Sequence, residues 1–204
     1  MTVVSRDPRV VEVPGERVVL RELTRADVDL MARWPRFSEP DLQWANLDLA
    51  TPRDRDAWFE RSRSNLTRRR FTIWSRDSDP RAGRPARSGR EPRAGAAATG
   101  GRAVGTIGLR NIDHRYGEGT LGIIVNAGDV GRGYGTDAIK ALVRYAFEAL
   151  GLRKVYLDVA EENERAQRCY DRIGFTRIGQ HRGTEGVRYI DMVLTRERWR
   201  MVDG

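Results

Sequence analysis

A glycine-rich turn lies between an apolar segment and a helical pattern at residues 130–136, which read Val-Gly-Arg-Gly-Tyr-Gly-Thr. Its three glycines permit positive φ and let a ligand come close to the backbone. The free N–H groups at a helix start, together with the helix dipole, favour an anion. Arg132 adds a charge-assisted donor, and Thr136 offers a hydroxyl to the ligand or to the helix as a cap. The turn therefore predicts a phosphate site that suits a pyrophosphate.

Two better-known phosphate motifs do not fit this turn. A Walker motif requires Gly-Lys-Ser/Thr, which is missing after the glycines, and the dinucleotide fingerprint has a different spacing. The competing interpretation is an ordinary tight turn, since glycines mark those as well. If the turn does bind phosphate, a different phosphate ligand is expected.

A second chemical group stands downstream, where Asn163, Ala166 and Tyr170 occur in a predicted helix. A spacing of seven puts Asn163 and Tyr170 on one helix face, two turns apart. A tyrosine with a pKa of about 10 is a protonated donor at neutral pH, so Tyr170 can supply a proton to a leaving group. The alternative for a lone tyrosine is a half-buried ring that packs the helix onto a sheet.

The elements that carry these motifs are predicted from periodicity and capping residues. Strands are expected at residues 17–23, 71–75, 103–112, 119–125, 154–160, 175–183 and 186–199. Helices are expected at 25–34, 52–66, 133–151 and 164–173, with caps at Thr24, Thr51, Asn163 and Gly174. This order of about seven strands and four helices predicts an α/β (α+β) domain with a mixed sheet, rather than a run of βαβ units.

The composition is that of one soluble domain spanning residues 1–204. Hydrophobic residues make up 39% and charged residues 32%, and no run reaches the roughly 20 apolar residues of a membrane span. The N-terminus lacks the apolar segment of a secretory signal. A single cysteine, Cys169, excludes an internal disulfide and a cysteine-based metal cluster. We expect a cytoplasmic protein without a metal.

The net charge of +8 raises the question of nucleic acid as a partner. Residues 76–102 contain seven arginines against three acidic residues, with no large apolar residue. This composition predicts a flexible insertion in the hairpin between 71–75 and 103–112. Contact with RNA or an acidic partner is the alternative, but no aromatic residue is interleaved to stack on bases, so nucleic acid is not the expected partner.

Taken together and in order, four segments resemble the GNAT superfamily, specifically its ribosomal-protein N-acetyltransferase-like branch. They are GTIGLRNI, LGIIV, DVGRGYGTDAIKALVRYAFE and NERAQRCYDRIGF, and the resemblance covers roughly residues 17–195. It implies the GNAT fold, with a mostly antiparallel sheet splayed between its fourth and fifth strands. It also implies an acyltransferase that moves an acetyl group from acetyl-CoA to a primary amine in a ternary complex.

The family's turn, Gln/Arg-x-x-Gly-x-Gly/Ala, matches here except at its first position, which is Val130. The resemblance implies that backbone groups near Ile124 bind the pantetheine arm and stabilise the oxyanion. It also implies that Asn163 orients the pantetheine and that Tyr170 is the catalytic residue that protonates the CoA thiolate. The cofactor-binding residues expected on this basis are Ile124, Val125, Val130, Gly131, Arg132, Gly133, Tyr134, Gly135, Thr136 and Asn163.

The base and the acceptor site are less well defined by the sequence. Thr120 stands where the branch commonly carries a glutamate, and Glu118, Asp113 and His114 are alternatives that would act through water. Aromatic and acidic residues around the first two helices suit an amine, namely Trp34, Phe37, Glu39, Asp41, Trp44 and Trp58. Of these, Glu39 and Asp41 are the predicted specificity residues, whereas Trp58 on an amphipathic helix is expected in the core.

Two other functions remain open from the sequence. One is a non-catalytic acyl-CoA-binding protein that has lost the glutamate but kept the turn. The other is a ribosome- or RNA-associated protein that uses the arginine-rich segment. The acceptor amine is not identified, and a homodimer is the default assembly.

Overall fold

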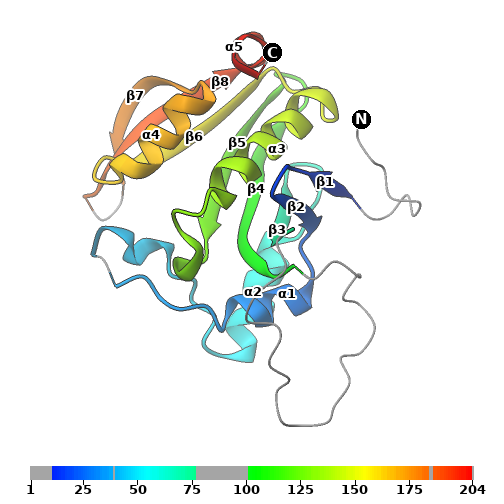
Figure 1. Cartoon of the computed structure of the whole chain (residues 1–204), viewed down its shortest axis with the longest axis vertical. Coiled ribbons are helices and arrows are strands. Elements are labelled where there is room, and N and C mark those ends of the chain that lie inside the picture. The colour runs from blue at the N-terminus through cyan, green and yellow to red at the C-terminus, as the bar shows by residue number, and fades with distance from the viewer. Residues whose placement is uncertain (1–10, 39, 77–100, 184–185, 204) are drawn as a thin grey trace.

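A computed structural model of the chain describes residues 11–38, 40–76, 101–183 and 186–203. Within them, eight strands form one sheet in the order β1-β2-β3-β4-β5-β6-β8-β7 (Figure 1). Neighbouring strands are antiparallel except β5 and β6, which are parallel. The strands are β1 (Glu12–Pro14), β2 (Val18–Glu22), β3 (Arg69–Ser75), β4 (Ala103–Asp113), β5 (Glu118–Val125), β6 (Lys154–Ala160), β7 (Thr176–Arg182) and β8 (Arg188–Thr195).

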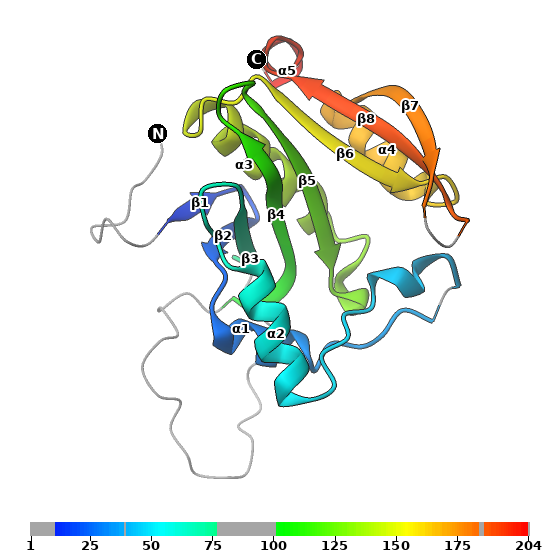
Figure 2. The ribbon, with the colours of Figure 1, turned by 180° about the vertical axis from the view of Figure 1, so that it is seen from behind.

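Helices cover both faces of this sheet. They are α1 (Arg25–Met31), α2 (Pro52–Ser62), α3 (Tyr134–Glu148), α4 (Glu164–Ile173) and α5 (Arg196–Asp203), with short 3-10 helices η1 (Pro40–Ala45) and η2 (Ala127–Asp129). The helices α3 and α4 lie on one face, and α1 and α2 lie on the other (Figures 1 and 2). The mixed, mostly antiparallel sheet with helices on its faces confirms the predicted fold class.

The main core forms where α3 packs on β2, β4 and β5. Ala138, Leu142 and Ala146 recur every four residues on α3 and are fully buried. Burying a side chain the size of Leu142 stabilises the fold by about 1.5–3 kcal/mol. The small alanines on either side of it let the helix approach the sheet closely, and the helix therefore presents its first turn at the open end of β5.

The sheet divides between β5 and β6, as the sequence predicted. Their pairing covers only residues 118–120 and 154–156, which are the first three residues of each strand. Beyond Thr120 the two strands diverge, and one edge of β5 has no partner strand among the described residues (Figure 2). This opening lies beside the N-terminus of α3 and the N-terminal half of α4.

The predicted caps are confirmed at three helices. Thr24 and Thr51 each form a capping box, and Asn163 accepts a hydrogen bond from the Ala166 N–H. Thr136 does not cap α3: the N-cap is Gly133, which makes no side-chain cap bond. The prediction of Thr136 as a cap is therefore wrong, because its side chain faces α4 instead.

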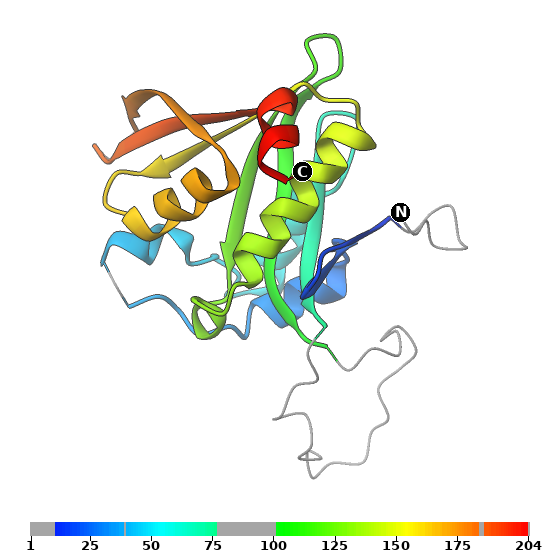
Figure 3. The ribbon, with the colours of Figure 1, turned by 45° about the horizontal axis from the view of Figure 1, so that its top comes forward.

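Several element boundaries differ from prediction. The expected final strand through residue 199 ends at Thr195, and α5 begins at once, so Trp199 packs from a helix (Figure 3). The second helix ends at Ser62 rather than 66. The strand β1 was missed because it has only three residues, and η1 was missed because it lacks a helical apolar pattern.

Most of the arginine-rich segment 76–102 lies outside the described residues. Its ends are held together, since the Ser75 N–H donates to the Arg102 carbonyl at 2.9 Å and β3 pairs with β4 in antiparallel register. The flexible insertion stays a prediction. In the part of the chain that the structure describes, no helix combines the length and apolar character needed to cross a membrane.

Candidate active site

A cavity of about 930 Å³ opens at the splay between β5 and β6. One group of lining residues comes from the α3 turn and α4, on one face of the sheet. A second group comes from β3, β4 and the segment around η1, on the other face. The lining residues include Arg17, Phe37, Arg70, Arg110, Val125, Gly131, Gly133, Thr136, Asp158, Asn163 and Tyr170. The cavity therefore runs through the sheet.

The turn before α3 has the geometry expected of a phosphate cradle. Gly131 and Gly133 both have φ of +83°, a conformation that costs other residues about 1–2 kcal/mol. Because no side chain caps α3, the N–H groups of its first turn stay available to a ligand. A pyrophosphate fits this set of donors, since backbone amides and a helix dipole both favour an anion.

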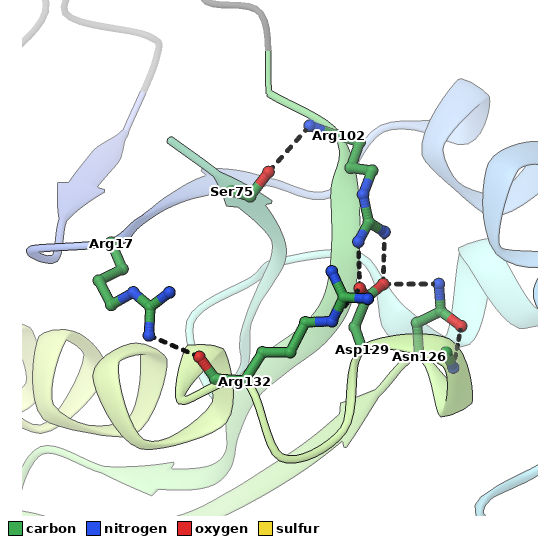
Figure 4. Close-up of polar contacts among 7 residues, drawn as sticks. Arg17, Ser75, Arg102, Asn126, Asp129 and Arg132 are labelled. Atoms are coloured by element: carbon green, nitrogen blue, oxygen red, sulfur yellow. Dashed lines mark hydrogen bonds and ion pairs between the residues drawn. The ribbon is translucent and has the colours of Figure 1, made fainter. Parts of the chain in front are cut away.

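The turn is also surrounded by cationic side chains. Arg17 donates to the Arg132 carbonyl at 2.6 Å (Figure 4). Its guanidinium also lies 5.3 Å from the ring centre of Tyr134. Arg165 and Lys140 also line the cavity. The sequence predicted Arg132 and Tyr134 as site residues. It did not predict Arg17, which lies 115 residues before Arg132 in the chain.

Asp137 fixes Arg17 beside the turn. Its carboxylate accepts hydrogen bonds from the N–H groups of Glu16, Arg17 and Val18, at 3.1, 2.8 and 2.9 Å. A Cβ at Gly15 would lie 2.5 Å from a carboxylate oxygen of Asp137, so this approach requires glycine. The carboxylate in the first turn of α3 thus holds the turn between β1 and β2, and it also lines the cavity.

A buried carboxylate supports the turn from below. Asp129 is 1% exposed and is paired with the guanidinium of Arg102 through both oxygens (Figure 4). The Asn126 side-chain amide donates to it at 3.0 Å, and Arg132 Nε lies 3.8 Å away. Arg102 belongs to the arginine-rich segment, so one of those arginines has a structural role that composition alone did not indicate.

Tyr170 is buried in the floor of the cavity. Its ring packs edge to face against Phe175, with 5.7 Å between ring centres. Burial is the main cause that raises the pKa of the Tyr170 phenol, and the neighbouring Cys169 and Asp158 raise it further. The phenol is therefore a protonated donor throughout the physiological range. The packing interpretation of this tyrosine is therefore observed, while its role as a catalytic proton donor stays a prediction.

The other expected cofactor contacts line the same cavity. Asn163 uses its side-chain oxygen to cap α4 and lines the cavity. Thr136 Oγ1 lies 3.1 Å from Cys169 Sγ and links α3 to α4. Ile124, Val125 and Val130 are lining residues as well. Eight of the ten expected cofactor residues therefore line the cavity; Arg132 and Tyr134 belong to the same turn but are not among the lining residues.

Strand pairing decides which backbone groups face the opening. The Asn126 N–H donates across the β4–β5 ladder at 2.9 Å. Because hydrogen-bonded and non-hydrogen-bonded pairs alternate in such a ladder, Ile124 is bonded to Thr106, whereas Val125 stands opposite Gly105 in a non-bonded pair. The N–H and C=O of Val125 therefore point to the open edge, and those of Ile124 do not.

The predicted alternatives for the base lie away from the cavity. Asp113 accepts hydrogen bonds from its own turn, and Glu118 accepts them from Lys154 and Tyr156. They stand near the start of β5, whose seven further residues to Val125 span roughly 23 Å. His114 belongs to the same turn, and Thr120 lines a neighbouring depression of the surface. Sequence analysis missed Asp158, the carboxylate on β6 that lines the cavity.

The acceptor residues predicted around the first helices are only partly described. Glu39 lies outside the described residues, and Asp41 and Trp44 belong to η1 without described side chains. Phe37 lines the cavity. Trp34 and Trp58 pack against a small core cluster beneath α1, which confirms the core prediction for Trp58.

Comparison with known families agrees with this geometry. The model of the acetyltransferase (GNAT) domain matches residues 17–176. The chain belongs to the GNAT acetyltransferase family. GNAT acetyltransferases transfer acyl groups, and the splayed sheet and uncapped helix start described above are the parts of this chain that such a reaction would use.

Individual relatives are more distant. The chain is 35% identical over 80 residues to the spermidine N(1)-acetyltransferase of Escherichia coli (strain K12), and this match covers 39% of this chain and 43% of that protein. It is 34% identical over 90 residues to an aminoglycoside N(6')-acetyltransferase type 1 of Klebsiella pneumoniae, covering 44% and 40%. The matches span less than half the length of both relatives.

A solved structure extends the fold likeness to the whole molecule. The spermidine N-acetyltransferase of Vibrio cholerae, in complex with CoA and spermine, superposes with a TM-score of 0.65 at 17% identity. The superposition covers 91% of this chain and 99% of that one. At this identity the likeness establishes the fold, and the chemistry must be argued from the residues.

Proposed function

We propose that this protein is an acetyl-CoA-dependent N-acetyltransferase that acylates a primary amine by direct attack. The observation that carries the proposal is that the uncapped start of α3 and the phenol of Tyr170 line one cavity at the splay of the sheet. Relatives that are named as spermidine and aminoglycoside N-acetyltransferases support an amine as acceptor.

Acetyl-CoA would supply the activated acyl group and, through its pyrophosphate, the anion that the turn suits. The amides that follow Gly131 and Gly133 would bind the pyrophosphate, with Arg17 and Arg132 at the rim. The Asn163 amide group would orient the pantetheine arm. The Val125 N–H, which points to the open edge, would stabilise negative charge that develops on the acyl oxygen.

Two side chains have roles in the proposed reaction, one in proton transfer and one in binding the amine. As the C–N bond forms and the C–S bond breaks, Tyr170 gives its proton to the departing sulfur and later recovers one from the amine or from water. Asp158 is the carboxylate best situated to attract the amine: its side chain is 34% exposed and accepts a hydrogen bond from Arg110, whereas Asp129 is 1% exposed and paired with Arg102, and Asp137 accepts from backbone amides. We assign Asp158 to amine binding and positioning, in place of the glutamate expected at Thr120.

Calorimetric titration with acetyl-CoA tests the cofactor site. Gly131→Glu adds a negative charge where the pyrophosphate would bind, and we expect affinity to fall by about tenfold to one hundredfold. Gly151→Glu is the matched control at the other end of α3. Gly131 and Gly151 have positive φ, of +83° and +70°, and both have open space for a Cβ.

The comparison separates charge at the cradle from backbone strain. Equal loss of affinity in both variants would attribute the effect to strain and count against the cradle. Absence of acetyl-CoA binding by the wild type would overturn the acetyltransferase proposal, and binding without acetyl transfer to any amine would favour the non-catalytic acyl-CoA-binding alternative.

A further inference from the structure

Two arginines lie at the acceptor end of the cavity, on the face of the sheet opposite α3 and α4. Arg70 on β3 and Arg110 on β4 both line it. Arg110 donates to Asp158 at 2.8 Å. Arg70 has no carboxylate partner among the described residues, and its guanidinium lies 5.6 Å from the ring centre of Trp58. The Arg70 guanidinium can therefore bind an anion at the end of the cavity where the amine is expected to enter.

The strands provide a path from Arg70 to the splay. Arg70 pairs with Gly108 on β4, and Gly108 pairs with Gly122 on β5. Residues directly opposite one another share a face of the sheet, so the two glycines form a floor without side chains next to the arginine. A Cβ at Gly108 would lie 3.2 Å from Cδ of Arg70, which means that the arginine stem lies directly over this glycine.

The local charge does not suit a polycation. Burial first, and then the positive charges of Arg68 and Arg110, lower the pKa of Arg70 to about 10. The guanidinium is still charged at neutral pH, and it is held in a partly desolvated position near like charges. An anion bound over Gly108 and Gly122, in what we call the trough, would offset these positive charges, whereas a second ammonium group there would be repelled.

Building on the proposed function, we infer that the acceptor carries a carboxylate or phosphate close to its amine, and that Arg70 binds this anion while Asp158 attracts the ammonium group. A zwitterion such as an α-amino acid, or a peptide with an acidic residue at its N-terminus, matches the pair of charges. Spermidine, which is cationic throughout, does not. Arg70 is therefore a specificity-determining residue.

The test compares acceptors that differ only in the anion. We would measure thiol release from acetyl-CoA with phenylalanine against phenethylamine, with lysine against cadaverine, and with spermidine. Pairs of peptides that begin with Asp or Asn separate an acidic N-terminus from a free amino acid as the source of the anion. A charge-assisted hydrogen bond predicts a kcat/KM about tenfold to one hundredfold higher for the anionic member of at least one pair.

Variants connect the preference to Arg70. Arg70→Met should abolish the preference and leave the affinity for acetyl-CoA unchanged, while Arg70→Lys, which keeps the charge, should retain part of it. Arg63→Met is the matched control, because Arg63 also lies over an aromatic ring of α2, at 6.0 Å from the Phe59 centre, but outside the cavity. Binding of N-acetylphenylalanine to the CoA complex, measured by calorimetry, gives a readout that does not depend on turnover.

The outcomes are distinguishable. Equal or better use of the amines without a carboxylate, or an unchanged preference in Arg70→Met, would overturn the inference and leave the acetyltransferase proposal intact. If acetyl-CoA binds but no amine releases thiol, both fall together. If Arg70→Met does not fold, the preference of Arg70→Lys relative to the wild type decides, since an unaltered ratio of kcat/KM values there would contradict recognition by a planar guanidinium.

Discussion

Replacing Arg102 with methionine should destabilise the protein more than its location at the end of a basic segment suggests. The Asp129 carboxylate is 1% exposed and is paired with Arg102 through both oxygens, one of which also accepts from Asn126. Removing one member of a buried ion pair costs about 3–5 kcal/mol, because the other charge stays buried. Arg102 is itself 32% exposed, and Arg132 lies 3.8 Å from Asp129, so both effects reduce the penalty. We expect a loss of about 2–3 kcal/mol.

Urea denaturation followed by circular dichroism measures this loss, and the melting temperature should fall by about 5–10 °C for a chain of this size. The double variant Arg102→Met/Asp129→Asn provides the control, because it removes both charges and leaves the Asn126 contact possible. It should be more stable than Arg102→Met alone. A single variant within about 0.5 kcal/mol of the wild type, or a double variant no better than the single one, would refute the reasoning.

Three further predictions concern the site. Tyr170→Phe should lower kcat about one hundredfold with unchanged acetyl-CoA affinity, measured by thiol release and calorimetry; equal kcat would remove Tyr170 from the chemistry. Burial raises the pKa of Tyr170 above its usual value of about 10, so the phenol stays mostly protonated up to that pH. The pH profiles of the wild type and Tyr170→Phe should therefore have the same shape up to about pH 10; a decline seen in the wild type and missing in Tyr170→Phe would contradict this. Asp137→Ala leaves three backbone N–H groups without their acceptor and should cost about 2–3 kcal/mol in urea unfolding, with a smaller loss for Asp137→Asn.

Much of the fold follows from local patterns in the sequence. Thr24, Thr51 and Asn163 begin helices where side-chain oxygens can accept the first free N–H groups, and these positions were predictable from residue type. The strand at 154–160 matched the structure at both ends. The C-terminal helix α5 was missed because the alternation of residues 187–194 was extended through Trp199, although Thr195 accepts a hydrogen bond from the Arg198 N–H at 3.2 Å, which is a local sign of a helix start.

In the candidate site, too, residues in local motifs were predicted from the sequence, and residues brought in by strand pairing were not. Gly131 and Gly133 were identified because positive φ selects for glycine, and Tyr170 was identified from its spacing with Asn163. Arg17 and Arg70 were not identified, since their roles depend on which strands lie together. The position of Arg17 beside the α3 turn and that of Arg70 over Gly108 cannot be predicted from neighbouring residues in the sequence. The trough over Gly108 and Gly122 depends on the register of β3, β4 and β5.

The divergence of β5 from β6 also bears on the kinetics. Because the cavity reaches both faces of the sheet, a donor bound from the side of α3 leaves the opposite approach open to the acceptor. On the proposed function, either ligand would be able to bind first, and each product would leave by the side from which its parent entered. A compound that joins both ligands covalently would have to thread one half through the gap, so its association should be slow even where its affinity is high.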